Sequence, residues 1–547
     1  MKKALKVLAV AILGIAAVAC SSAEKMAKMA DQVQVSCTPG VLELVAGKVD
    51  AAVSVTYPSG YFHPNAILEV TPVLVYDGGE YAAAPFLYQG EKVKDNYKVV
   101  PTAGGTVTER ISIPYREGME KSYLELRGVV SYKNKSVNLP VKKVADGVNT
   151  TYMIVDDFGR IAYKPDGYQE IITSTEEGQI LYTINSSDVR GTQLSGQSIK
   201  DFQAALDEIR DNERKTLTGT EIVAYASPDG GEKLNDKLST NRANSAEKAW
   251  DRITKGHDAL DPDVKSIGQD WEGFQELVSK SDIQDKDLIL RVLSMYSDPA
   301  VRENEIKNMS QIYKELKDGV LPELRRARFI ANVEYQNYTA DELKTLIDQN
   351  IDVLDEAALL HAATLVSDTQ KKVDIYNKAI QKFDSDKARF NKGVAYLAAD
   401  DDAKAADAFA AVKTKDADLQ NALGVIALHK GDLDAATRYF TAAGTQNANI
   451  NLGVIDILKG DYPAAVSKLA DAPGCCFNPT LAYILNGELD KASARIMCND
   501  ARANYLRAII AARKGDAAGV RENIAKASED PYFAQRYQND IEFAAYR

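Results

Sequence analysis

A short pattern recurs in the last third of the chain and constrains its fold more than any other feature. The six residues Gly-Asp-Leu-Asp-Ala-Ala from Gly431 return in related form from Gly460, Gly487 and Gly515. The intervals are 29, 27 and 28 residues. A repeat of this length is typical of units that stack on one another, because one unit alone cannot bury its apolar face. Strand patterns are absent here and alanine is frequent, so we predict an α-solenoid over residues 339–547.

A second set of offsets indicates two helices in each unit. A glycine is followed sixteen residues later by a bulky apolar residue in three places: Gly393 and Phe409, Gly424 and Phe440, Gly453 and Leu469. The pattern resembles the tetratricopeptide repeat, whose small residues let paired helices approach closely, and the resemblance covers residues 355–530. The period is shorter than the 34 residues of that family, which leaves short helices and a related degenerate repeat both open. The resemblance implies a protein partner on the concave surface.

Residues 31–166 show a different periodicity. Apolar residues alternate with polar ones, as at Val33, Val35 and Cys37, which is the period of a β-strand. Turn residues such as Gly78-Gly79 separate the runs. We predict an all-β, sandwich-like domain.

Residues 167–338 mix the two patterns. Residues 179–184 and 221–226 read as strands, and each is followed by apolar residues at intervals of three and four, the spacing of an amphipathic helix. The fold class is therefore multidomain α+β, with a central α/β domain.

The turn and helix after the second strand carry the candidate binding residues. Ser227-Pro228-Asp229-Gly230-Gly231, followed by Asn235, Ser239 and Arg242, resembles the OmpA-like peptidoglycan-binding domain, and the match covers residues 180–253. The resemblance also implies a third strand near 266–270 and a closing strand at 327–335, with a charged helical insertion at about 271–321 between them. It implies that Arg242 binds the carboxylate of a stem peptide. Asn235, Ser239 and Arg242 share one face of the helix because they lie at i, i+4 and i+7. Pairing of Arg242 with a surface acid is the alternative.

One position departs from that family. The aspartate that takes the ammonium group of the stem peptide falls on Ser227. Loss of this charge removes about 1.5–3 kcal/mol of binding, unless Asp229 substitutes two residues further on. Capping of the following helix is an equally good role for Asp229.

The first nineteen residues predict export. Lys2, Lys3 and Lys6 precede an apolar run at residues 7–19, the layout of a secretory signal, and the run is shorter than the roughly 20 residues that span a bilayer. The tetrapeptide at 17–20, Ala-Val-Ala-Cys, resembles the bacterial lipobox. It implies a lipid on Cys20, a lipidated tether at 20–30 and an outer-membrane location facing the periplasm. An ordinary signal peptide cut near residue 19 is the alternative.

Charge and motif content exclude other functions. The chain has 66 Lys and Arg against 78 Asp and Glu, so it has no long-range attraction for nucleic acid. We find no catalytic motif and no metal-ligand or cofactor spacing, and predict that the chain is not an enzyme and needs no cofactor. A disulfide from Cys498 to Cys475 or Cys476 is possible in an oxidising compartment, but we favour small buried apolar roles for these cysteines.

These features together predict a lipid-anchored envelope scaffold. Its OmpA-like domain would contact the peptidoglycan stem peptide, and its repeats would hold an envelope protein. The main alternative is an adaptor for an outer-membrane assembly or secretion complex that has lost wall binding. A carbohydrate-binding envelope protein is a third possibility, resting on the β-domain alone.

Overall fold

The computed structural model describes residues 22–283, 286–308, 310–474 and 477–547. The predicted signal and the predicted lipidation site Cys20 lie outside these residues, as do Cys475 and Cys476. The chain divides into two compact units, which are described separately: the first holds residues 1–164 and 386–547, and the second holds residues 165–385. Within the described ranges, no helix has the length and apolar character that crossing a membrane requires.

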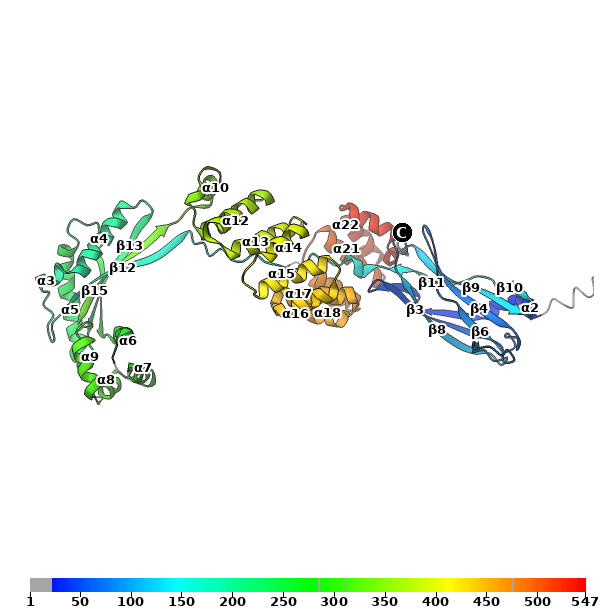
Figure 1. The fold of residues 1–547 in the computed structure, drawn as a ribbon, viewed down its shortest axis with the longest axis horizontal. Coiled ribbons are helices and arrows are strands. Elements are labelled where there is room, and N and C mark those ends of the chain that lie inside the picture. The colour runs from blue at the N-terminus through cyan, green and yellow to red at the C-terminus, as the bar shows by residue number, and fades with distance from the viewer. Residues whose placement is uncertain (1–21, 284–285, 309, 475–476) are drawn as a thin grey trace, which may run out of the picture. The chain divides into compact units, whose positions relative to one another are not determined.

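The N-terminal part of the first unit is all-β, as the alternating pattern predicts (Figure 1). The main strand order is β1-β3-β2-β11-β9-β4-β6-β7, with β8 beside β3, β5 beside β4 and β10 beside β9. Buried residues of β3, β4 and β9 belong to one hydrophobic core. The strands are β1 (Gln34–Thr38), β2 (Val41–Val45), β3 (Lys48–Tyr57), β4 (Ile67–Tyr76), β5 (Gly79–Ala82), β6 (Phe86–Gln89), β7 (Lys98–Val99), β8 (Gly105–Pro114), β9 (Ser122–Tyr132), β10 (Lys135–Asn138) and β11 (Lys142–Asn149).

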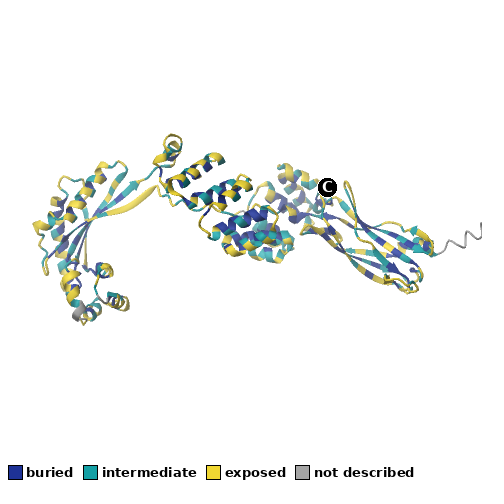
Figure 2. Cartoon of the chain, in the orientation of Figure 1, coloured by how far each residue is buried: buried dark blue, intermediate teal, exposed yellow. Residues whose placement is uncertain are grey.

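The sheet is continuous where a sandwich would have two separate sheets. β2 and β11 pair in parallel and so join the part that contains β3 to the part that contains β9. Alternate positions of the long strands are buried, which Figure 2 shows as dark stretches along them. The all-β prediction is confirmed, and the parallel β2–β11 pair is the feature that sequence periodicity could not reveal.

The residues just after the predicted anchor are not a free tether. Residues Ser22–Lys28 form helix α2, and Ala23 and Met26 are buried in the core of the β-domain. A 3-10 turn at Ala30–Gln32 then leads into β1. The polar composition predicted a flexible link, but two apolar side chains one helical turn apart are enough to bind this stretch to the sheet.

The C-terminal part of the first unit is a stack of helix pairs, as the repeat pattern predicts (Figure 1). Gly431 has a φ of +72°, a left-handed conformation that glycine adopts without strain, and ends one helix. Asp432 caps the next helix by accepting a hydrogen bond from the backbone N–H of Ala435. The same arrangement, a left-handed glycine followed by an aspartate that caps the next helix, occurs at Gly460 and Gly515. The helices are α13 (Asp386–Leu397), α14 (Asp402–Ala410), α15 (Ala417–His429), α16 (Leu433–Ala443), α17 (Gln446–Lys459), α18 (Tyr462–Leu469), α19 (Phe477–Leu485), α20 (Leu489–Arg495), α21 (Ala501–Arg513), α22 (Ala517–Ala527) and α23 (Pro531–Asn539), with a 3-10 turn η4 (Ile541–Phe543).

The glycines inside the pairs sit where the helices approach most closely. A β-carbon added to Gly393 would lie 2.5 Å from the ring of Phe409, and one added to Gly424 would lie 2.5 Å from the ring of Phe440. The sixteen-residue offset in the sequence is therefore the contact between the two helices of one pair.

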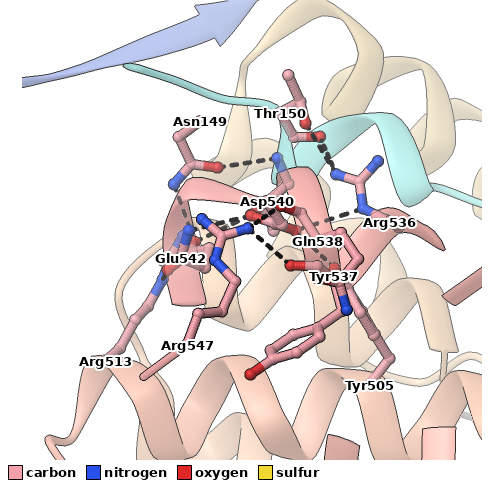
Figure 3. Close-up of polar contacts among 11 residues, drawn as sticks. Asn149, Thr150, Tyr505, Arg513, Arg536, Tyr537, Gln538, Asp540, Glu542 and Arg547 are labelled. Atoms are coloured by element: carbon pink, nitrogen blue, oxygen red, sulfur yellow. Dashed lines mark hydrogen bonds and ion pairs between the residues drawn. The ribbon is translucent and has the colours of Figure 1, made fainter. Parts of the chain in front are cut away.

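The β-domain and the last repeats form one body within the first unit. Their buried residues belong to a single hydrophobic core. A polar cluster also joins them: the Glu542 carboxylate accepts hydrogen bonds from Asn149 at 2.9 Å and from Arg513 at 3.0 Å, and Arg536 donates to the Thr150 carbonyl at 2.8 Å (Figure 3). The Glu542 side chain is 7% exposed and that of Arg513 is 25% exposed, so the ion pair between them is partly shielded from water.

The second unit contains the predicted α/β domain. Its sheet has the order β12-β15-β13-β14, in which β13 and β14 are parallel and β15 is antiparallel to both of its neighbours. Helices α4 and α5 supply Phe202 and Trp250 to a core with Phe329 of β15. The elements are β12 (Ile171–Leu181), α3 (Gly191–Leu194), α4 (Gln197–Asp211), β13 (Lys215–Ala226), α5 (Glu232–Ile253), β14 (Pro262–Gln269) and β15 (Arg326–Gln336).

Within its described residues, the second unit holds seven further helices. Four of these lie in the predicted insertion between β14 and β15 and share a small core of their own. Three more follow β15, in a stretch that the sequence pattern assigned to the solenoid. The helices are α6 (Trp271–Lys280), α7 (Lys286–Met295), α8 (Pro299–Asn308), α9 (Ser310–Gly319), α10 (Ala340–Gln349), α11 (Glu356–Thr364) and α12 (Thr369–Phe383).

Candidate functional site

A row of asparagines on the inner helices of the repeats binds a segment of the same chain. We call residues 155–164 the groove segment, and the surface of α13, α15, α17 and α19 that contacts it the repeat groove. In three places the Oδ1 of an asparagine accepts a hydrogen bond from a backbone N–H of the segment, and its Nδ2 donates to the carbonyl of the same residue. These pairs are Asn478 with Asp156, Asn451 with Arg160 and Asn391 with Lys164, at N···O distances from 2.6 to 3.0 Å.

A fourth asparagine completes the row. Asn421 donates to the Arg160 carbonyl at 2.9 Å and accepts from Nδ2 of Asn451 at 3.1 Å. Asn391, Asn421 and Asn451 are all buried. Buried amides are costly unless both of their polar atoms are bonded, and an extended main chain offers one donor and one acceptor per residue. The row is therefore suited to binding the main chain of a polypeptide segment.

The groove segment runs opposite to the order of the repeats. Asp156 pairs with α19, Arg160 with α17 and Lys164 with α13. The bound residues are four apart, a span of roughly 13–14 Å in an extended chain. The first step leads from α19 to α17, and the second leads from α17 past α15 to α13. The chain thus leaves the β-domain at the late repeats and passes along the groove before the first repeat begins at residue 386.

Side chains of the segment make a second set of contacts. The Lys164 ammonium lies 2.5 Å from Asp416 and 3.0 Å from Asp418. Asp156 pairs with Arg502 at 2.9 Å, in a salt bridge that is partly exposed. These ion pairs fix which charges the groove accepts at its two ends.

Gly159 lies at the tightest point of the segment. Its φ is +79°, and a β-carbon there would lie 2.9 Å from a methyl group of Val425. Both the backbone conformation and the close contact favour glycine at this position.

A cavity of about 330 Å³ lies between the groove segment and the repeats. Phe158 and Arg160 line one side, and Val454, Leu506 and Thr480 line the other. The Thr480 side chain is fully buried, and no group in the described part of the chain accepts or donates a hydrogen bond at its hydroxyl. The segment therefore leaves part of the groove unfilled, with one polar group in it.

The asparagines were missed by the sequence reasoning, although a signal is present. Asn391, Asn421 and Asn451 follow one another at intervals of 30 residues on otherwise apolar helices. A polar residue that recurs in the register of a repeat at a buried position points to a shared ligand, because each copy would otherwise be unsatisfied.

The predicted wall-binding residues of α5 lie together at the end of β13, but they are buried. Asn235 donates to the carbonyls of Ser227 at 3.0 Å and Gly230 at 2.7 Å. Ser239 donates to the Asp236 carbonyl and accepts from the backbone N–H of Gly268 at 3.1 Å. Both side chains therefore hold the turn in place.

The resemblance implies that Arg242 binds a ligand. In the structure, its guanidinium is not exposed to solvent. It is fully buried and donates to the carbonyls of Ser186 at 3.0 Å, Tyr225 at 2.9 Å and Thr183 at 3.3 Å. Burial lowers the pKa of Arg242 to about 10. Over the described residues, no carboxylate lies within ion-pair distance of it, so the alternative surface ion pair is not formed.

Ser227 and Asp229 form a charged group with an arginine. The Ser227 hydroxyl donates to the Asp229 carboxylate and accepts from Nε of Arg325 at 3.3 Å. Arg325 also lies 3.5 Å from Asp229. Asp229 is paired with Arg325, and the hydrogen bond expected of a helix cap is not formed, since the cap position of α5 is Gly231.

The insertion packs over this turn. A narrow pocket is lined by Pro228 and Asp229 of the turn and by Ile306 and Lys307 of α8. Leu316 of α9 completes its apolar wall. The insertion therefore covers the turn that carries the predicted acidic residue.

The described residues contain no group of three or more His, Cys, Asp or Glu side chains that could hold a metal ion. Cys37 is present as a free thiol.

No family model and no curated protein matches the chain. Solved structures do match. A tetratricopeptide repeat protein from Parabacteroides merdae is 14% identical, with a TM-score of 0.30, over 37% of this chain and 91% of the other. YrrB, a TPR protein with an unusual peptide-binding site, is 18% identical, with a TM-score of 0.21, over 37% and 99%. The Cut9–Hcn1 tetramer of APC/C is 12% identical, with a TM-score of 0.32, over 57% and 65%. By their own helix-pair geometry, residues 386–527 form a TPR-like repeat array.

His429 contacts the groove segment, and protonation of its ring changes the hydrogen bonds that it makes. Its Nε2 lies 2.7 Å from the Phe158 carbonyl and its Nδ1 lies 2.8 Å from Asp402. Burial acts to lower the pKa of His429, but the Asp402 carboxylate and the Phe158 carbonyl outweigh it, so the pKa is raised. The protonated ring donates to both partners, whereas the neutral ring can donate to only one.

We expect docking of the groove segment to weaken as pH rises. A raised pKa means that the stabilisation is complete below the unfolded value of about 6.5 and is lost as pH rises through the higher folded value. Hydrogen exchange of residues 155–164 should therefore show protection, relative to the His429→Gln variant, that is largest at low pH and declines upward. An equal pH profile in both proteins would contradict this role of His429.

Proposed function

We propose that the chain is a lipid-anchored adaptor of the bacterial outer membrane, facing the periplasm, whose repeats bind a protein partner. The observation that carries this proposal is the asparagine row, because each bidentate pair binds main chain rather than a particular side chain. TPR-like arrays expose extended surfaces, and contacts to protein partners are the use that such surfaces favour. We propose no catalytic role, since no sequence motif for one is present.

A photo-crosslinking experiment tests the adaptor function. A crosslinking residue at Arg502, an exposed position on α21 that lines the cavity and lies outside the groove segment, is compared with one at Arg438, an exposed position on α16. In native envelopes we expect one discrete crosslinked protein from position 502 and none from position 438. Crosslinks from position 438 alone would place the partner on the outer face, and the absence of crosslinks at both positions would contradict the adaptor function.

The anchor is tested separately at Cys20. The apolar run at residues 7–19 is too short to span a bilayer, so a lipid on Cys20 is the proposed attachment. Cys20→Ala should move the protein from the membrane pellet to the soluble fraction, and Cys37→Ala is the matched control that should stay in the pellet. A Cys20→Ala protein that remains membrane-bound after a high-salt wash would contradict lipid anchoring.

Peptidoglycan binding by an OmpA-like domain is a second candidate, in which the protein is also a wall-contacting scaffold. The observation that favours it is the unpaired charge of Arg242, since a buried cation without a counter-ion is costly and an incoming carboxylate would compensate it. Asp229 and Ser227 lie nearby as acceptors for an ammonium group. The strand order β12-β15-β13-β14 with its two helices supports the resemblance.

Retention on purified sacculi tests the second candidate. The whole protein in detergent should be retained, and Arg242→Lys, which keeps the charge but loses the planar fork, should weaken binding at least tenfold. Asp229→Asn should also weaken it, whereas Arg252→Ala, an exposed position on the same helix, should not. If the parent protein is not retained, peptidoglycan binding is contradicted, and the adaptor function remains without wall contact.

A further inference from the structure

We propose that the groove segment is an exchangeable resident ligand, and that the repeat groove binds extended partner segments with the same spacing of charges and glycine. This inference rests on the proposed adaptor function and names the kind of partner. The pattern, taken from the contacts above, is an acidic residue, a glycine three positions later and a lysine five positions after the glycine.

The main-chain contacts make exchange chemically simple. Every bidentate asparagine bond is made to the backbone N–H and C=O of Asp156, Arg160 or Lys164. Another extended segment offers the same groups at the same four-residue interval, so it can replace these bonds one for one.

The side-chain contacts define which segments fit. Lys164 faces two carboxylates, Asp416 and Asp418, so a basic residue is preferred at that end. Asp156 faces Arg502, so an acidic residue is preferred at the other end. Residues beside Val425 must be small and able to adopt a positive φ, as Gly159 does.

The resident segment does not use the whole groove. The half-open cavity of about 330 Å³ beside Phe158 is not filled by the segment, and the Thr480 hydroxyl in its wall lacks a partner among the described residues. A segment with a larger apolar side chain at this point would fill space that the resident one leaves empty. A partner can therefore bind more tightly, residue for residue, than the segment it displaces.

Connection within one chain favours the resident segment. A tethered ligand acts at an effective concentration in the millimolar range, so a free peptide of equal intrinsic affinity competes poorly. Weakening the resident segment without altering the groove should therefore raise the affinity for an added peptide.

The test uses the full chain in detergent and a fluorescein-labelled synthetic peptide of residues 154–166. Gly159→Val weakens the resident segment through strain and the contact with Val425, and Lys164→Glu weakens it by repulsion from Asp416. Each variant should bind the peptide at least tenfold more tightly than the parent protein. Adding Asn451→Ala to either variant should abolish that gain, because two main-chain bonds to the peptide are lost.

Gly167→Val is the matched control, since Gly167 also has a positive φ but has open space around it and lies outside the segment. It should bind the peptide no better than the parent. Hydrogen exchange of residues 155–164 reports release of the segment in each variant. The inference is overturned if the released variants bind no more tightly, if Asn451→Ala leaves binding unchanged, or if neither variant releases the segment. Partner crosslinks confined to position 438 would overturn it while leaving the adaptor function in place.

Discussion

The pairing of asparagine side chains with the main chain of residues 156–164 is the interaction on which the first unit depends. It satisfies buried amides that would each be costly if left alone, and it holds in an extended form a connection that would otherwise be a free linker. Because each of α13, α15, α17 and α19 contributes one asparagine to these bonds, the register of the segment and the register of the repeats determine each other. The resident segment is thus part of the fold and also an example of what the groove binds.

A second constraint is the shared core of the β-domain and the last repeats. The largely buried Glu542 carboxylate is stabilised because Asn149 and Thr151 supply donors from the β-domain side of the junction and Arg513 supplies one from the repeats. Apolar packing across the same junction removes the independence that two separate domains would have. The β-domain therefore provides a fixed origin for the groove segment, which begins a few residues after the junction.

The second unit shows how a familiar pattern can be altered by its surroundings. The sheet and the helix that carries Arg242 have the order that the sequence indicates, but three carbonyls bind the guanidinium and the insertion covers the Asp229 turn. A wall ligand would have to bind the Arg242 guanidinium more strongly than these three carbonyls do. That requirement is why we place the adaptor function first and wall contact second.

The sequence by itself determined the elements. Period-two runs defined the strands, Gly-Asp turns defined where repeat helices end and begin, and the sixteen-residue offset from Gly424 to Phe440 identified a contact, because all of these depend on residues close in the chain. Only the tertiary structure decided that residues 22–28 pack on the sheet, that Arg242 is enclosed, and that Arg160 meets Asn451 across 291 residues. Such contacts depend on how distant segments are brought together, and local periodicity carries no information about that.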